Sequence, residues 1–335
     1  MKPSRFLISF MTITLVALSC SGRIPQRPDV ELLFNQREVV TSSDLCDVQG
    51  TAIFGDYLFS LRNTGRCVVT NLAEERFISE FALGSNGKRN HANSGFFGKD
   101  YYEEGDRFPL LYVSHCTQSP VPEIAIPELD SLVRLCFVER ILCDEAGEPC
   151  GSELVQVINY EPSAWNSRIW AHDSSNPQWM YCYGNTIGNK AEGNRFIIQK
   201  LPLPAFSKDN FIVRMDDSDV IETIYADEVM QEGARGPQHT ILQGAVVVDG
   251  IMYIPVGGGS AKNPSELFYL DLNARDKSGK PYRYGYYDYT DVVPCEMEDM
   301  DVWRDKLVCT TNDKADLRPV YAFDLKKFKC FLRRK

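Results

Sequence analysis

The sequence predicts an all-β protein, a β-propeller of five to seven four-stranded blades, and two observations carry this prediction. Short apolar runs separated by turns recur along the chain, whereas stretches with apolar residues at helical spacing are scarce. One strand-turn-strand pattern also occurs near both ends, because residues 49–72 match residues 243–272 almost position for position. Such units are expected to stack in a ring, since one blade cannot bury both of its faces alone.

Each unit begins with a strand, a two-residue turn and a second strand. The predicted turns are Gly55-Asp56, Asp249-Gly250 and Arg304-Asp305, and Asp-Gly is typical of tight hairpins. Two looser units lie between these copies, with strand-like runs at residues 109–114 and 135–141, and at residues 178–183 and 195–201. Residues 77–83 and 154–158 are expected to be fourth strands. A two-sheet sandwich is the alternative, but it would not require such similar units at both ends.

The number of blades stays open at this point. Five units are legible, but residues 204–238 and 273–297 are long enough to hide a degenerate blade. The early run Val30–Phe34 precedes the first unit, and we expect it to complete the last blade and close the ring. Closure would remove an exposed strand edge, which otherwise invites pairing with another chain.

The N-terminus has the features of an export signal. Lys2 and Arg5 precede an uncharged run of 14 residues, Phe6–Ser19, which as a helix rises only about 21 Å and is too short to span a bilayer. The small residue before Cys20 resembles the lipobox of bacterial lipoproteins, in which the Cys is acylated. We therefore expect a signal peptide at 1–19, a tether at 20–29 and one propeller domain at 30–335. Ordinary secretion is the alternative, because Ala17 stands where Leu is commoner.

Charge and cysteine content agree with an exported binding protein. The net charge of −10 argues against a nucleic-acid partner, which requires clustered Lys and Arg. Apart from Cys20, ten cysteines remain, an even number that suits disulfides in an oxidising compartment. Several of them lie inside apolar runs, where a buried free thiol is the alternative. Their spacing lacks the short pairs of a zinc site, so no metal site is predicted.

A lipobox-like Cys followed by a propeller with Gln-Gly and Asp-Gly strand starts resembles the TolB-like β-propeller lipoproteins of Gram-negative cell envelopes. The similarity covers about residues 44–330. The resemblance implies a six-bladed arrangement, an outer-membrane location through the lipid anchor, and a binding surface at the mouth of the ring. It supplies no catalytic residues, because its motifs are architectural.

The candidate site residues are polar side chains beside the predicted inner strands. Inner-strand starts aim side chains toward the central axis, so these residues are expected to form one binding surface at a mouth of the ring. The predicted ligand-binding residues are Gln49, His91, Asn93, His172, His239 and Gln243. Converging imidazoles could also abstract a proton from a uronic acid. By analogy with propeller polysaccharide lyases, the catalytic candidates are His91, His172, His239, Tyr183 and Arg168. The alternative is that these His residues cap loops.

Two functional classes therefore compete. We expect a lipid-anchored binding or scaffold protein for a glycan, peptide or envelope protein, with no cofactor, and the alternative is a secreted lyase. No paired-carboxylate or other catalytic motif favours an enzyme. An acidic cluster, Glu296, Glu298, Asp299 and Asp301, is interpreted as an acidic strand lining the axis, with a Ca²⁺ site as the alternative.

Overall fold

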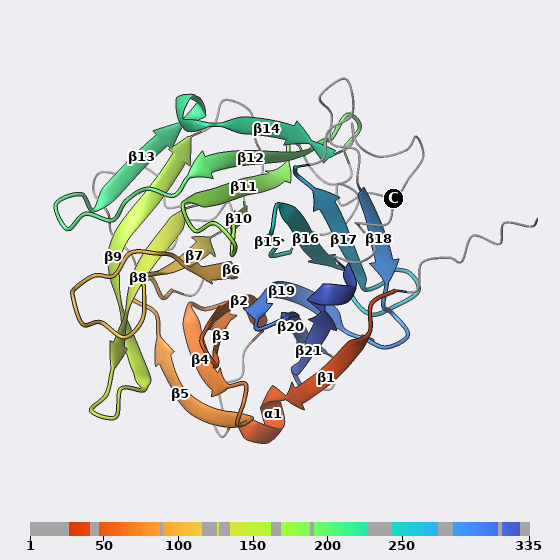
Figure 1. Ribbon diagram of the computed structural model, residues 1–335, viewed down its shortest axis with the longest axis horizontal. Coiled ribbons are helices and arrows are strands. Elements are labelled where there is room, and N and C mark those ends of the chain that lie inside the picture. The colour runs from red at the N-terminus through yellow and green to blue at the C-terminus, as the bar shows by residue number, and fades with distance from the viewer. Residues whose placement is uncertain are drawn as a thin grey trace, which may run out of the picture.

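The computed structural model shows five β-sheets arranged around a central axis (Figure 1), so the chain is a five-bladed β-propeller. The structure describes residues 27–40, 47–87, 90–115, 126, 135–161, 169–187, 191–226, 243–273, 284–313 and 317–328. Within this part of the chain, no helix is long and apolar enough to cross a membrane.

Each blade is an antiparallel sheet of consecutive strands, numbered here from the axis outward. Blade I contains β2 (Val48–Phe54), β3 (Tyr57–Arg62), β4 (Arg66–Asn71) and β5 (Arg76–Ala82). Blade II contains β6 (Ala92–Phe97), β7 (Leu111–His115), β8 (Cys136–Cys143) and β9 (Pro149–Glu161). Blade III contains β10 (Ile169–His172), β11 (Trp179–Asn185), β12 (Phe196–Pro202) and β14 (Glu222–Tyr225). Blade IV contains β15 (Val246–Val248), β16 (Ile251–Val256), β17 (Glu266–Asp271) and β18 (Tyr284–Asp288).

Blade V closes the ring with a strand from the other end of the sequence. It contains β19 (Glu296–Trp303), β20 (Lys306–Asn312), β21 (Pro319–Asp324) and, outermost, β1 (Val30–Asn35). Strand β1 pairs antiparallel with β21, and Val30 lies opposite Phe323. The prediction that residues 30–34 complete the last blade is therefore confirmed.

The predicted two-residue turns are also confirmed. Each joins the first two strands of its blade, and each needs left-handed backbone, with φ of 61° at Gly55, 50° at Asp249, 76° at Gly250 and 56° at Arg304. Primed turns require such φ values, because their twist matches that of the two strands.

The two segments that could have hidden another blade belong to neighbouring sheets. Residues 284–288 form β18, the fourth strand of blade IV, and residues 222–225 form β14, the fourth strand of blade III. Between β12 and β14 the chain crosses to blade II, where β13 (Ile212–Asp216) pairs parallel with β9 as a fifth strand. The described sheets number five, one fewer than the TolB-like resemblance implies.

A capping arrangement then turns the chain from β13 back to blade III. The short 3-10 helix η1 (Asp217–Asp219) follows β13, and the Asp216 carboxylate accepts a hydrogen bond of 2.7 Å from the Ser218 N–H. The Asp219 carboxylate accepts one of 2.9 Å from the Asp216 N–H. These two bonds form a capping box, which satisfies N–H groups that the helix start would leave open.

The core lies between blades rather than inside any one of them. One large hydrophobic cluster fills each of the five interfaces; for example, Ala52 and Phe59 of blade I pack with Phe97 and Val113 of blade II. Because burial of each large apolar side chain contributes about 1.5–3 kcal/mol, every blade depends on both neighbours.

The seven described cysteines are free thiols. Five of them are buried in or beside the strands, where they pack as small apolar side chains. The two exposed ones, Cys143 and Cys150, lie at the end of the β8–β9 hairpin.

Candidate functional site

The five inner strands β2, β6, β10, β15 and β19 run in the same direction along the axis. The Asp299 carboxylate of β19 accepts a hydrogen bond of 2.7 Å from the Thr51 N–H of β2, and the Asp301 carboxylate accepts one of 2.7 Å from the Ile53 N–H. Both strands thus advance by two residues together, as only parallel neighbours do. All inner strands therefore begin at one end of the ring, which we call the mouth.

Four of the predicted ligand-binding residues lie at the mouth. Gln49 is at the start of β2, and His91 and Asn93 are at the start of β6, next to it. The Gln243 Nε2 donates to Glu296 Oε1 at 3.2 Å, at the start of β19. The structure therefore brings Gln49, His91, Asn93 and Gln243 to one end of the axis, from three different blades.

The mouth side chains differ in how fully they are paired. His91 is half-buried, and its Nδ1 lies 3.1 Å from Asn63 Oδ1. Burial lowers the pKa of His91, so it is neutral at pH 7. Asn93 is only 1% exposed, and its Oδ1 has no hydrogen-bond partner among the described residues. Because a buried unpaired carbonyl is costly, a donor from a ligand or water would fit there.

Sequence reasoning missed a second group of mouth residues, which come from the outer strands of blade V. Asn312, at the end of β20, donates to Glu298 and to the Val48 carbonyl, and it accepts from Arg318. Arg318 also lies 3.4 Å from Asp47. The only signal in the sequence was the acidic strand start at Glu296, since buried carboxylates need donors nearby.

His172 lies deeper along the axis than the mouth residues. Its ring stacks on Phe96 with centroids 5.0 Å apart, and Phe96 lies five residues after His91 on β6, which at about 3.3 Å per residue is roughly 15 Å along the strand. The structure therefore separates His172 from His91 and Gln49.

Tyr183 is part of the blade packing rather than of the mouth surface. It is fully buried on β11 in the cluster between blades III and IV, and its hydroxyl donates to the Gln243 carbonyl at 2.7 Å. Tyr183 therefore positions Gln243 from behind. His115 is also buried, with its ring 5.8 Å from that of Phe137.

Three predicted residues, Cys20, Arg168 and His239, lie outside the described residues. Arg168 directly precedes β10, and His239 is four residues before Gln243 in the sequence.

The acidic cluster of β19 lies along the axis. Asp299 is fully buried, and one of its oxygens accepts from both Thr51 N and Gly95 N, at 2.7 and 3.2 Å. Burial raises the pKa of Glu296, Glu298, Asp299 and Asp301, and raises that of Asp301 to about 7. Within the described residues, no three His, Cys, Asp or Glu side chains are close enough to hold a metal ion together.

Gly244 leaves the space that the Asp299 carboxyl group occupies. A Cβ at Gly244 would lie 2.6 Å from the Asp299 Cβ and still closer to its carboxyl atoms. Glycine is therefore required at this position by the close approach of β19, and the Gln243-Gly244 pair is a structural feature of the axis.

His172 and Asp301 form a buried pair whose pKa values move in opposite directions. His172 Nε2 lies 3.5 Å from Asp301 Oδ1. Burial lowers the pKa of His172 to about 3 from 6.5, and raises that of Asp301 to about 7 from 3.8. Between about pH 4 and pH 6.5 the folded state thus holds a proton on Asp301 that the unfolded state lacks, and lacks one on His172 that the unfolded state holds.

Single substitutions of this pair are expected to give pH dependences of opposite sign. The Asp301 contribution to stability is present below its unfolded pKa and is lost as pH rises toward 7, whereas the His172 contribution is lost as pH falls below 6.5. Relative to the parent, Asp301→Asn should gain about 1.4 kcal/mol of unfolding free energy per pH unit from pH 4.5 to 6, and His172→Gln should lose as much. Urea unfolding at several pH values measures this. Parallel curves for both variants would contradict the assigned protonation states.

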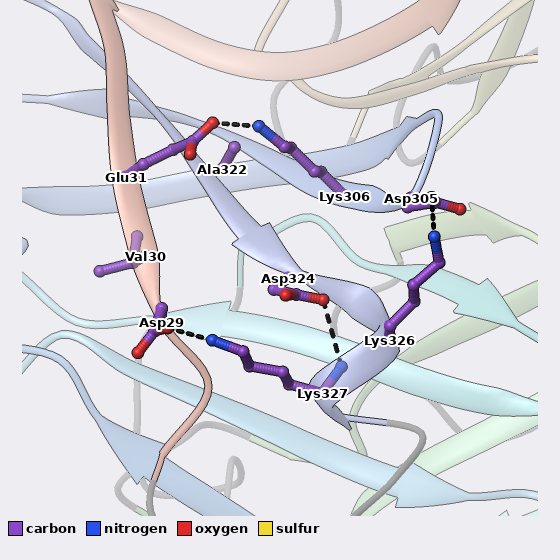
Figure 2. A pocket seen from close by; sticks show the side chains of 9 residues that line it. All are labelled: Asp29, Val30, Glu31, Asp305, Lys306, Ala322, Asp324, Lys326 and Lys327. Carbon is purple, nitrogen blue, oxygen red and sulfur yellow. Dashed lines mark hydrogen bonds and ion pairs between the residues drawn. The ribbon is translucent and has the colours of Figure 1, made fainter.

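A charged groove of about 300 Å³ lies where the ring closes (Figure 2). Three ion pairs cross it, and they join β1 and the residue before it, the β19–β20 turn, β20 and the helical turn at residues 325–328: Lys306–Glu31, Lys326–Asp305 and Lys327–Asp29. Because each lining lysine is matched by a carboxylate, the groove is a seam of the ring closure rather than a pocket with free charge.

The tryptophans near residue 170 do not form an exposed sugar platform in the described chain. Trp170 is buried between blades II and III, and the Lys200 ammonium lies 4.6 Å from the Trp179 ring centroid. Trp165 lies outside the described residues.

Comparison of the chain with known protein families and with curated proteins finds no match to either.

Proposed function

We propose that the protein is a lipid-anchored β-propeller of the cell envelope that binds a glycan, peptide or partner protein at the mouth. The observation that carries the proposal is the set of amide, imidazole and carboxylate groups at that end of the axis, with the Asn93 Oδ1 buried and unpaired. Such groups recognise hydroxyl or amide groups through directed hydrogen bonds.

The charge of the mouth favours uncharged or cationic ligands. Glu296 and Glu298 lie beside Gln243 and Asn312, and Arg318 is the cation that reaches Asn312 and Asp47. Carboxylates at a binding surface repel anionic ligands. A neutral glycan or a peptide is therefore a better candidate than a polyuronide.

Two features support binding over lyase chemistry. A lyase base must reach the proton that it abstracts, but Tyr183 is buried and donates to a backbone carbonyl, and His172 is stacked on Phe96 away from His91. The five lyase candidates therefore do not form one catalytic group among the described residues.

The proposed anchor connects to the rim of the ring between blades IV and V. The Arg27 guanidinium pairs with the Asp291 carboxylate and donates to the Asp288 carbonyl at 2.6 Å. The Tyr289 hydroxyl donates to the Pro28 carbonyl at 3.0 Å. These contacts hold the end of the proposed tether on the ring, only a few residues after Cys20.

Substitution of the proposed lipidation site should release the protein from membranes. If Cys20 carries the lipid, Cys20→Ala should move the protein from the detergent-soluble membrane fraction to the soluble fraction, because a signal peptide alone leaves no anchor. Fractionation and intact-mass measurement check this, with Cys150→Ser as the matched control for loss of a thiol. Unchanged partitioning of Cys20→Ala would refute the anchor.

Substitution of mouth residues should weaken binding without changing the fold. We expect Asn93→Ala combined with Gln243→Ala to lower retention of a glycan-array or pull-down ligand about 10-fold, since a lost hydrogen bond costs about 0.5–1.5 kcal/mol. Tyr286→Ala, an exposed residue on β18, is the control. Equal binding by both variants would place the site elsewhere. Release of unsaturated uronides from a polyuronide, abolished by His91→Ala, would instead establish the lyase alternative.

A further inference from the structure

The β8–β9 hairpin brings two exposed cysteines together at its tip. Leu142 lies opposite Gly151, but the next residue, Cys143, lies opposite Pro149, so the pairing register shifts at this point. The shift leaves Cys150 as the extra residue of a β-bulge, in which two residues of one strand face one residue of the other. Cys143 and Cys150 are therefore cross-strand neighbours.

This arrangement meets the distance requirement for a disulfide. Cross-strand neighbours have Cα atoms about 4.5–5.5 Å apart, and disulfides join Cα atoms about 4.4–6.8 Å apart. Both thiols are free and exposed. The other described cysteines are buried: Cys67, Cys136, Cys182, Cys295 and Cys309.

The turn that joins the two cysteines is held in one conformation. The Asp144 carboxylate accepts hydrogen bonds of 2.9 Å from the N–H groups of Ala146 and Glu148, and Gly147 adopts a φ of 78°. These bonds fix the turn between the strands, so little chain entropy opposes closure of a bond between the thiols.

The hairpin tip also joins two blades. Arg76 of β5 pairs with Glu148 at 2.8 Å, and the Ser79 hydroxyl donates to the Pro149 carbonyl. From blade II itself, the Arg107 guanidinium donates to the Gly147 carbonyl. A covalent bond at the tip would therefore lie beside the outer seam between blades I and II.

We propose that Cys143 and Cys150 form a thiol–disulfide exchange site that takes a protein or small-molecule disulfide as oxidant. One cysteine thiolate attacks a sulfur of the oxidant, forms a mixed disulfide and expels the first thiolate. The second cysteine thiolate then attacks the protein sulfur of the mixed disulfide, closes the Cys143–Cys150 bond and expels the second thiolate. The two cysteines lose two electrons and two protons, and the oxidant is reduced to two thiols.

The exchange should be faster at alkaline pH. Burial raises the pKa of Cys143, although the neighbouring Arg107 guanidinium opposes this change. Because the thiolate is the attacking species, the rate should increase with pH through the region where the thiol ionises.

Incubation of the full chain with oxidised glutathione tests the proposal. A Glu-specific protease cuts after Glu145 and Glu148, which separates the two cysteines, so the bond appears as a pair of peptides that dissociate on reduction. We expect this linked pair from the parent, and no modification of the five buried cysteines in the folded protein.

Single variants distinguish exchange from simple exposure. Cys150→Ser should retain glutathione on Cys143, because no second thiol is present to displace it, whereas the parent should release it and close the bond. The Cys143→Ser variant should retain glutathione on Cys150 in the same way. A parent that carries stable glutathione on both cysteines, or that leaves both thiols open to alkylation, would overturn the proposal.

Discussion

Deletion of residues 30–40 is expected to leave a chain that aggregates or melts at a much lower temperature than the parent. The deletion removes β1, which covers the edge of β21, and helix α1 (Gln36–Val39), which contacts blade I. The Gln36 side chain is fully buried, donates to Ser60 Oγ at 3.0 Å and accepts from Arg62 Nη2 at 2.9 Å. An uncovered strand edge beside a buried polar group favours pairing between chains.

Two leucine-sized positions on β1 separate closure from general sensitivity of the strand. Phe34 is 6% exposed and packs between blades V and I, whereas Leu32 is 50% exposed on the same strand. Phe34→Ala should cost about 3–5 kcal/mol and Leu32→Ala less than about 1 kcal/mol. Urea unfolding and size-exclusion chromatography measure both. A deletion variant that melts like the parent would disprove closure by β1.

Addition of one methyl group at Gly244 is expected to destabilise the ring strongly. The new Cβ would overlap the buried Asp299 carboxyl group, whose oxygen accepts from Thr51 N and Gly95 N. Displacement of the carboxylate would leave two buried N–H groups unpaired, at about 1–3 kcal/mol each, in addition to about 1–3 kcal/mol for overpacking. Gly244→Ala should therefore cost about 3–6 kcal/mol in unfolding free energy.

The matched control is Gly151→Ala on β9. Its added Cβ would meet the nearest atom, on the Leu142 side chain, at 3.5 Å, which is an ordinary contact, so the cost should be below about 1 kcal/mol. Combining Gly244→Ala with Asp299→Ala should cost less than the sum of the single changes, because the second change removes the overlap. Strict additivity would show that the two residues do not meet on the axis.

The fold could be predicted from the sequence because its blades repeat a local pattern. Residues 49–61 and 243–255 place the same turn between the same strands, and positive φ at Gly55 and Gly250 is a requirement that the sequence displays. Ring closure was predictable from Val30–Phe34, because an unassigned apolar strand at one end suits an incomplete blade at the other.

The blade count and the site geometry depended on contacts that no local pattern encodes. The strand 212–216 has no signal that assigns it to blade II instead of a new blade, since its partner β9 precedes it by a whole blade. His172 and His91 both stand beside inner strands, but depth along the axis depends on strand register. The shallow position of His91 and the stacking of His172 on Phe96 follow from that register.

The parallel strand β13 limits how this ring can have changed by gain or loss of repeats. In propellers built from self-contained blades, duplication or excision of the stretch that encodes one blade yields a ring with one blade more or fewer. Here residues 169–225 encode blade III but also supply the outermost strand of blade II. Excision of that stretch would strip blade II of a strand, and a duplicated copy would carry a spare strand with no sheet to join. Recombination at blade boundaries is therefore viable for blades I and IV, while blades II and III must be inherited together.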